Sequence, residues 1–295
     1  MRTEKEMMEL IKDVARNDER IRAVYMNGSR TNSNAPKDIY QDYDIVYVVT
    51  ETTPFIKEDK WIYVFGEFIM IQEPDKLDHG IGIDMDFGRS YGYLMLFKDG
   101  NRIDLHIKTK ESMIDDYGTD KLTLPLLDKD NCLPPIPTPT DIDYHIKQPT
   151  VGQYVSCTNN FWWCLQNVAK GIKRDEMPYA KRMFEETTRA SLDQMVFWWI
   201  GIKYDFQVSS GKMGKYFKKY LPHSYWDLYK ATYSDGHYEN FWNSVFVTCD
   251  LFRTLAKYVA VHFSFVYPLD DDINMTAYLI HLRCLPPDAT EIFKN

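Results

Sequence analysis

The hydrophobic positions in the first part of the chain follow two patterns. In residues 3–17, Thr3 and Glu6 have the spacing of a helix capping box, and apolar residues then recur every three or four positions. This pattern predicts an amphipathic helix. Farther along, short apolar runs lie between polar turns, which is typical of β-strands. The runs that we expect to form strands are 21–27, 42–49, 68–72, 91–97 and 101–107.

The segments between these runs are predicted to differ in structure. Lys98-Asp99-Gly100 separates the last two runs and predicts a β-hairpin with a tight turn. Residues 61–72 are apolar, but their spacing fits a helix or a strand, and only the final FIMIQ is clearly strand-like. The stretch Leu77–Arg89 is rich in Asp and Gly and is expected to be a loop.

The pattern changes near residue 130. Segment 133–149 is rich in proline, which favours an extended linker over a helix or strand. Beyond it, apolar residues recur at helical spacing. We therefore predict an α+β fold, with an N-terminal domain (1–135) built on a small mixed sheet, a linker (136–150) and a C-terminal helical-bundle domain (151–295). The clearest predicted helical segments of the second domain are 161–172, 180–202, 212–221, 224–233 and 240–263.

Composition and charge narrow the classes of function. The net charge is −8, from 35 basic and 43 acidic residues, which is the wrong sign for a nucleic-acid-binding protein. No apolar run approaches the roughly 18 residues of a membrane helix, and the charged start MRTEKEMMEL does not resemble a signal peptide. The five Cys include no C-x-x-C pair, which argues against a disulfide framework and a zinc knuckle. We expect a cytoplasmic protein that binds neither nucleic acid nor membrane.

Three aspartates are the strongest candidates for chemistry. Asp42 and Asp44 are two positions apart on a predicted strand, so their side chains project from the same face. Asp104 lies on the polar face of a later strand, in which Ile103, Leu105 and Ile107 form the apolar face. If these strands are neighbours, three carboxylates converge, and such a set suits Mg²⁺. With a bound nucleotide, it suits a two-metal reaction at phosphorus.

Gly28 and Ser29 follow the first predicted strand. Glycine permits close approach of a phosphate, and the serine hydroxyl and nearby amides are hydrogen-bond donors for it. This is not a P-loop, because no G-K-[ST] follows. Arg30 is either a phosphate ligand or a surface arginine. The chain has no G-x-S-x-G elbow, and its Asp86-Phe87-Gly88 lacks the H-R-D of a kinase, so neither serine-hydrolase nor kinase chemistry is supported.

These residues carry a resemblance to a known family. Gly28-Ser29-Arg30, Asp42-Tyr43-Asp44 and Asp104 match the GS…DxD…D pattern of nucleotidyltransferases of the DNA polymerase β superfamily. The N-terminal block MRTEKEM…DERIRAV and MNGSR…QDYDI, together with GKMGKYFKKYL in the helical part, resembles the aminoglycoside 6-adenylyltransferases more closely. The resemblance covers essentially the whole chain.

The resemblance implies a reaction and a set of ligands. The family transfers AMP from ATP to the 6-hydroxyl of streptomycin and releases pyrophosphate, with Mg²⁺ as cofactor. Asp42, Asp44 and Asp104 would hold the metal, and Asp104 is also a candidate proton acceptor. ATP would enter between the domains. Its expected contacts are Gly28, Ser29 and Arg30, and, from the helical domain, Arg189, Lys212, Lys215 and Tyr233.

A cationic aminoglycoside requires an acidic cleft with aromatic walls. The candidates for it are Asp84, Asp86, Asp175, Glu176 and Glu185, with Trp162 or Trp163. Each acid also fits a plain surface position, and Lys212 and Lys215 also fit a solvated helix face. The alternatives are the same chemistry on another small drug, such as a lincosamide, or a non-catalytic nucleotide-binding relative. A monomer and a homodimer are both compatible with the sequence.

Overall fold

The computed structural model describes residues 1–293, which fall into two units, one spanning Met1–Asp143 and the other beginning at Tyr144. This division lies inside the segment 136–150. The first unit holds a six-stranded mixed sheet with short helices, and the second is helical, so the predicted α+β class is confirmed. Within residues 1–293, no helix has both the length and the apolar character that a membrane span requires.

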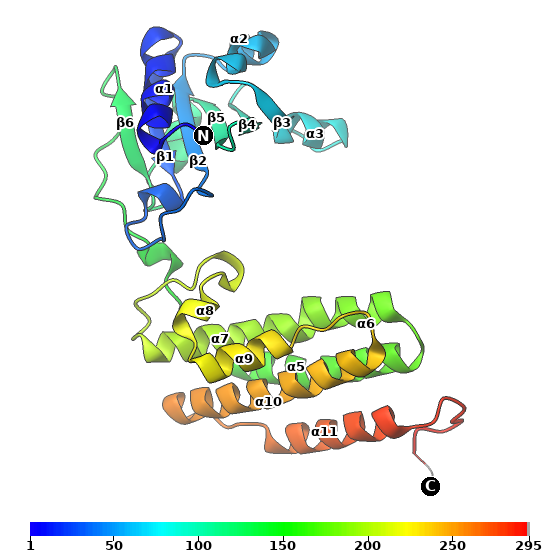
Figure 1. The fold of residues 1–295 in the computed structure, drawn as a ribbon. Coiled ribbons are helices and arrows are strands. Elements are labelled where there is room, and N and C mark those ends of the chain that lie inside the picture. Colours follow the sequence, from blue (N-terminus) through cyan, green and yellow to red (C-terminus); the bar gives the residue numbers. More distant parts are fainter. Residues whose placement is uncertain (294–295) are drawn as a thin grey trace. The chain divides into compact units, whose positions relative to one another are not determined.

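The first unit contains the whole sheet (Figure 1). Its strands are β1 (Ile21–Asn27), β2 (Tyr43–Val49), β3 (Phe68–Gln72), β4 (Ser90–Phe97), β5 (Arg102–Thr109) and β6 (Leu124–Asp128). Its helices are α1 (Glu4–Asn17), α2 (Thr53–Lys57), α3 (Pro74–Gly80) and α4 (Lys110–Asp116), and three short 3₁₀ segments are η1 (Ser29–Thr31), η2 (Asp59–Phe65) and η3 (Ile142–Tyr144).

The strands lie in the order β3-β4-β5-β2-β1-β6. Neighbours are antiparallel except β2 and β5, which are parallel and central. The hairpin predicted around Lys98-Asp99-Gly100 is the β4–β5 pair, and Gly100 provides the positive φ of 86° in its turn. The pairing of the aspartate-bearing strands, on which the sequence argument depended, is thus confirmed.

The two faces of the sheet are covered unequally. Helix α1 packs on one face through Met7, Ile11 and Ala15, and the hydroxyl of Tyr47 donates a 2.6 Å hydrogen bond to the Ile11 carbonyl. On the other face, Met113 of α4 joins a small cluster that includes Val46 and Val48.

The N-terminal helix begins as predicted, with Thr3 as its N-cap and both capping-box hydrogen bonds to Glu6 present. The expectation of a loop over Leu77–Arg89 is wrong in its first part, because α3 continues to Gly80. None of the residues of α3 is buried, so the helix has no apolar stripe from which a sequence pattern could detect it.

The helical unit consists of four long helices and several short ones. They are α5 (Val151–Lys173), α6 (Met177–Met183), the π-helical turn η4 (Phe184–Thr188), α7 (Arg189–Lys203), η5 (Lys212–Gly214), α8 (Phe217–Tyr220), α9 (His223–Ala231), α10 (Tyr238–Phe263) and α11 (Leu269–Cys284). Figure 1 shows α5, α7, α10 and α11 running side by side. The predicted helical segments all contain helix, whereas α11 was not predicted.

Aromatic side chains fill the core of the helical unit. Phe161 of α5 and Phe252 of α10 stack with ring centroids 3.6 Å apart. Helix α11 is attached in part by a polar contact, because Nε and Nη2 of Arg253 donate hydrogen bonds of 2.7 and 2.6 Å to the two carboxylate oxygens of the buried Asp272.

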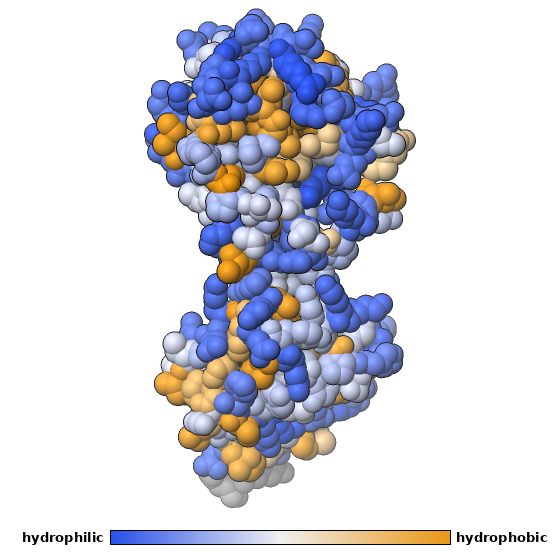
Figure 2. Space-filling model, turned by 90° about the vertical axis from the view of Figure 1, so that its left-hand side faces the viewer, coloured by the Kyte–Doolittle hydropathy of each residue, from blue (hydrophilic) through white to orange (hydrophobic). Residues whose placement is uncertain are grey.

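Figure 2 shows hydrophobic side chains interspersed among a mostly hydrophilic surface on the face drawn there.

Candidate active site

The sheet register brings the predicted aspartates together. Asp44 on β2 pairs directly with Asp104 on β5, and Asp42 lies one residue before β2 begins. Directly opposed residues on one sheet face have side chains only a few ångströms apart, so like charges there repel. Because β2 and β5 are hydrogen-bonded along their length, the backbone fixes the position of Asp44 relative to Asp104, whereas Asp42 lies in the loop just before β2.

Arg102 is the cation that compensates part of this charge. Its Nε and Nη2 donate to the two oxygens of Asp104 at 2.7 Å each, and its Nη1 lies 3.5 Å from Oδ2 of Asp42. A strand carboxylate next to an arginine in sequence can also be a plain ion-pair partner with no catalytic role. The structure shows that pair, together with the second contact to Asp42.

The electrostatic strain is concentrated on Asp44. Burial, together with the charges of the neighbouring Asp104 and Asp42, raises the pKa of its carboxyl to about 6. Burial also raises the pKa of Asp42, with Arg102 acting in the opposite direction. A carboxyl whose charge is disfavoured by two like neighbours is stabilised in its ionised form when a cation arrives.

Gly28 lies directly against Asp44, and Ser29 follows it in the chain. Gly28 has φ +76°, and a Cβ at this position would come within 2.2 Å of Oδ2 of Asp44. Only glycine therefore permits both the backbone conformation and the approach to the carboxylate. Ser29 then begins the η1 turn, where its hydroxyl lies 3.5 Å from Nε2 of Gln41.

Arg30 is engaged in the loop that precedes β2. Its Nε and Nη2 donate to the carbonyls of Asp42 and Gln41 at 2.9 and 2.7 Å, and its guanidinium lies 3.7 Å from the ring centroid of Tyr43. The side chain is only 6% exposed. These contacts fix the backbone at Asp42, which is a positioning role and needs no phosphate.

The side chains at this edge of the sheet are oxygen donors of the kind that a hard divalent cation prefers. Three carboxylates lie there, two of them with raised pKa values, beneath a glycine that leaves room above Asp44. Among residues 1–293, however, no group of three or more His, Cys, Asp or Glu side chains is arranged to hold a metal ion. The two oxygens of Asp104 face Arg102 instead.

Three of the predicted residues in the helical unit form one cluster. Arg189 is 6% exposed, forms an ion pair with Glu185 and hydrogen-bonds Thr232 at 2.7 Å, while its guanidinium lies 3.8 Å from the ring centroid of Tyr233. Arg189 and Tyr233 were predicted as nucleotide contacts and Glu185 as a drug contact. The structure joins them as partners of one another, at the π-helical turn η4.

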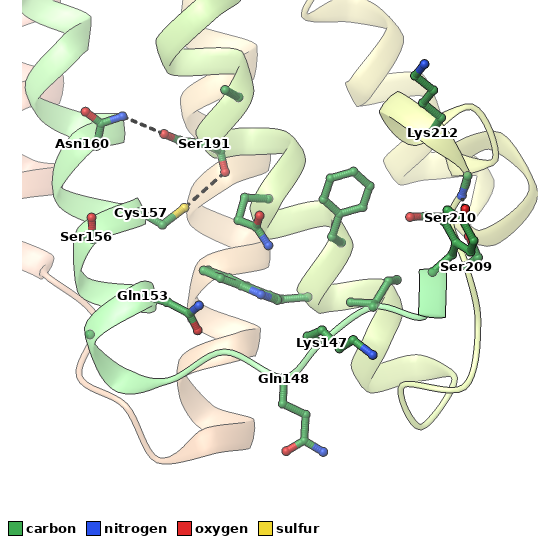
Figure 3. A pocket seen from close by; sticks show the side chains of 18 residues that line it. Lys147, Gln148, Gln153, Ser156, Cys157, Asn160, Ser191, Ser209, Ser210 and Lys212 are labelled. Carbon is green, nitrogen blue, oxygen red and sulfur yellow. Dashed lines mark hydrogen bonds between the residues drawn. The ribbon is translucent and has the colours of Figure 1, made fainter. Parts of the chain in front are cut away.

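Lys212 is carried by a turn with unusual backbone angles. Gly211, Met213 and Gly214 all have positive φ, between 56° and 74°. Lys212 also lines a cavity of about 810 Å³, whose walls come from α5, α7 and the loop before α8 (Figure 3). Lys215 is exposed and lies near the ring of Tyr216, and it does not line this cavity.

The remaining drug-site candidates are scattered. Asp84 and Asp86 are exposed in the loop after α3, and Asp175 and Glu176 are exposed between α5 and α6, where Asp175 accepts a 2.8 Å hydrogen bond from Tyr238. Trp162 is 2% exposed and packs edge-on against Phe161 and Phe252, so little of its ring is available to a ligand. Its neighbour Trp163 is exposed.

Sequence reasoning missed several residues that the tertiary structure brings to these sites. Gln153, Asn160 and Gln194 line the cavity. Gln153 belongs only to the capping box that begins α5 at Thr150, and Asn160 and Gln194 belong to no motif, so only a helical-wheel comparison of the two helices would have placed them on facing surfaces. Asp193 is adjacent in sequence, and its pKa is raised to about 6 by burial while it accepts a 2.7 Å hydrogen bond from Tyr229. Trp198 is only 4% exposed, and its remaining edge lines the cavity.

The chain is similar to characterised proteins over nearly its whole length. Residues 1–282 match the family described as streptomycin adenylyltransferase. The protein named aminoglycoside 6-adenylyltransferase from Campylobacter jejuni is 40% identical over 284 residues, covering 96% of both chains. Its namesake from Bacillus subtilis is 39% identical over 287 residues, covering 96% of this chain and 99% of the other.

One solved structure is also similar in sequence. It is titled as the crystal structure of an aminoglycoside 6-adenyltransferase from Bacillus subtilis, is 34% identical, and covers 97% of this chain and 100% of that one, with a TM-score of 0.48. The family match and the two sequence relatives together confirm the resemblance carried by the Gly-Ser, Asp-x-Asp and Asp104 motifs. The chain belongs to the streptomycin adenylyltransferase family.

Proposed function

We propose that this protein transfers AMP from ATP to the 6-hydroxyl of streptomycin and releases pyrophosphate. The observation that carries the proposal is the register of the two central strands, which sets Asp44 against Asp104 directly below Gly28. Family membership supports adenylyl transfer to an aminoglycoside. The choice of streptomycin and of its 6-hydroxyl is our inference from the family and from the names of the relatives.

Each residue of the acidic edge has a part in this reaction. Asp42, Asp44 and Asp104 would hold Mg²⁺, which supplies neutralisation of the phosphate charge and stabilisation of the leaving pyrophosphate. Ser29 and the backbone amides after Gly28 bind the terminal phosphates. Positioning of the hydroxyl in line with the α-phosphorus accounts for a large part of the acceleration.

Asp104 is also our candidate for the proton acceptor from the sugar hydroxyl. Its two oxygens are held by Arg102 at 2.7 Å, which fixes the direction in which the carboxylate presents its remaining lone pairs. Arg102 therefore acts as a positioning residue. It also limits the repulsion among the three acids while no cation is bound.

The experiment is a substrate panel with two readouts. The purified protein is incubated with ATP, Mg²⁺ and a set of aminoglycosides and lincosamides, and pyrophosphate release and product mass are measured. We expect streptomycin to gain one adenylyl group with one pyrophosphate released. Addition of a phosphate alone would contradict nucleotidyl transfer, and modification of a lincosamide but not streptomycin would change the substrate. ATP binding without any product would favour a non-catalytic relative.

A further inference from the structure

Many of the side chains that line the cavity of the helical unit carry hydroxyl or amide groups. Gln153, Ser156 and Asn160 line it from α5, Ser191 lines it from α7, and Ser209 and Ser210 line it from the loop before α8 (Figure 3). Hydroxyl and amide groups therefore face the cavity from three elements. Aromatic surface is added by Phe197 and Trp198 of α7.

The charge of the side chains that line the cavity indicates which of the two substrates of the proposed reaction it suits. Among the described residues that line the cavity there is no aspartate or glutamate, whereas Lys147 and Lys212 are present. A polycationic aminoglycoside is recognised by carboxylates, because these pair strongly with ammonium and guanidinium groups. A lining with two cations and no acid is suited instead to a neutral group that carries phosphates.

Gln194 is the most informative residue of the lining. Its amide makes no hydrogen bond to any of residues 1–293, in contrast to Asn160, whose Nδ2 donates to Ser191 at 3.2 Å, and Gln153, whose Oε1 accepts from the Thr150 amide at 2.9 Å. Because Gln194 lines the cavity, its amide donor and acceptor are both open to a ligand there. An amide side chain presents that pair in the geometry that matches N6 and N7 of adenine.

We propose that this cavity binds the adenosine part of ATP and selects the adenine base through Gln194. Phe197 and Trp198 provide the apolar surface against which a purine packs, the serine hydroxyls suit the ribose, and Lys212 suits the phosphates. This inference rests on the proposed function, since it assumes ATP as the nucleotide. It assigns to the helical unit the choice of base, which none of the motif residues of the sheet explains.

The test substitutes Gln194→Leu in the full-length protein, which removes the donor and the acceptor while keeping the side-chain size. Calorimetry measures ATP binding in the absence of drug, and steady-state assays with streptomycin compare ATP with ITP, in which the 6-amino group is replaced by oxygen. We expect about a tenfold loss of ATP affinity, a matching fall in the preference for ATP over ITP, and a kcat within about threefold of the wild type.

Two further variants keep the result interpretable. Gln207→Leu makes the same change at an exposed residue outside the lining, and should leave the ATP affinity unchanged. Ala190→Phe, at an exposed position on the cavity rim, should weaken ATP binding by filling the space, so the proposal does not depend on one variant folding.

The outcomes separate this inference from the proposed function. Unchanged ATP affinity and base preference in both cavity variants would overturn it, as would a raised KM for the drug with that for ATP unaltered. A wild-type protein that transfers no AMP, but whose ATP binding still depends on Gln194, would refute the proposed function and support the cavity assignment.

Discussion

The acidic edge of the sheet and the cavity of the helical unit are opposite in chemistry. At the edge, Asp42, Asp44 and Asp104 concentrate negative charge that Arg102 only partly compensates. The cavity is lined by hydroxyls, amides and two lysines, without a carboxylate. The first arrangement stores unfavourable electrostatic energy that a cation relieves, and the second leaves polar groups to be satisfied by a neutral ligand.

The difference indicates that the acidic edge acts on the transition state, whereas the cavity recognises a part of the substrate that does not react. Charged groups that act on the transition state belong on a rigid sheet, where the register fixes their separation. Groups that recognise an unreactive part of a substrate need only complementary hydrogen bonds and shape. We therefore expect changes at the acidic edge to lower kcat, and changes in the cavity to raise the KM for ATP.

The largest effect should follow from removing charge at the acidic edge. Asp44→Asn keeps the side-chain shape but removes a metal-ligand charge, and we expect turnover with ATP and streptomycin to fall by about 10⁴-fold or more. Pyrophosphate release measures it, with circular dichroism as a check on folding. Asp38→Asn, at an exposed position before β2, is the matched control and should retain activity. Turnover near that of the wild type in D44N would remove Asp44 from the metal site.

The second test asks whether Asp104 belongs to the catalytic edge or is only an ion-pair partner of Arg102. We expect Asp104→Asn to lower kcat by about 10²–10⁴-fold, with little change in the affinity for ATP or drug measured by calorimetry. Asp115→Asn, which removes an exposed partner of Arg89, should behave as wild type. A kcat for D104N within about threefold of wild type would assign Asp104 a structural role. It would also contradict the expectation that changes at the acidic edge lower kcat.

A smaller effect is expected from the glycine above Asp44. In Gly28→Ala the new Cβ would lie 2.2 Å from the Asp44 carboxylate, so the two must move apart. We expect about a 10²-fold loss of turnover, because displacement of a reacting group by an ångström has this order of effect. Gly82→Ala is a control with the same kind of backbone strain, since Gly82 has φ +91° and open space around it. Equal activity losses in both variants would mean that backbone strain, and not contact with Asp44, is responsible.

The smallest effect concerns stability. Because the folded state raises the pKa of Asp44 from 3.8 to about 6, it binds that proton more tightly than the unfolded chain. Without Mg²⁺, stability should therefore fall as the pH rises from about 4 to about 6. Asp44→Asn removes this cost, so at pH 7 the variant should be more stable than wild type by about 1–2 kcal/mol, with no difference below about pH 4.

Urea unfolding at several pH values measures this difference. Added Mg²⁺ should stabilise the wild type and not the variant, because a ligand that binds only the folded state shifts the unfolding equilibrium. A variant that is less stable than wild type at pH 7 would show that Asp44 is not under the electrostatic strain that distinguishes the acidic edge from the cavity.

The sequence predicted much of the first unit because its signals are local. The capping box at Thr3, the alternation along β5 and the turn at Gly100 each depend on residues close together in the chain. The short helix α3 and the last helix α11 escaped prediction. The first buries nothing, and the second is attached in part by the contact of Asp272 with Arg253, which no local pattern encodes.

By itself the sequence determined the motif residues, the α+β class and the family, because each is carried by residue type and spacing along the chain. Only the tertiary structure decided that Arg102 holds Asp104 and that Gly28 lies against Asp44. Only the tertiary structure shows that Gln194, Asn160 and Lys212 line the same cavity. The reason is that strand register and helix packing join residues far apart in the chain, and the energy of burying a charge or an amide depends on those neighbours and not on the local sequence.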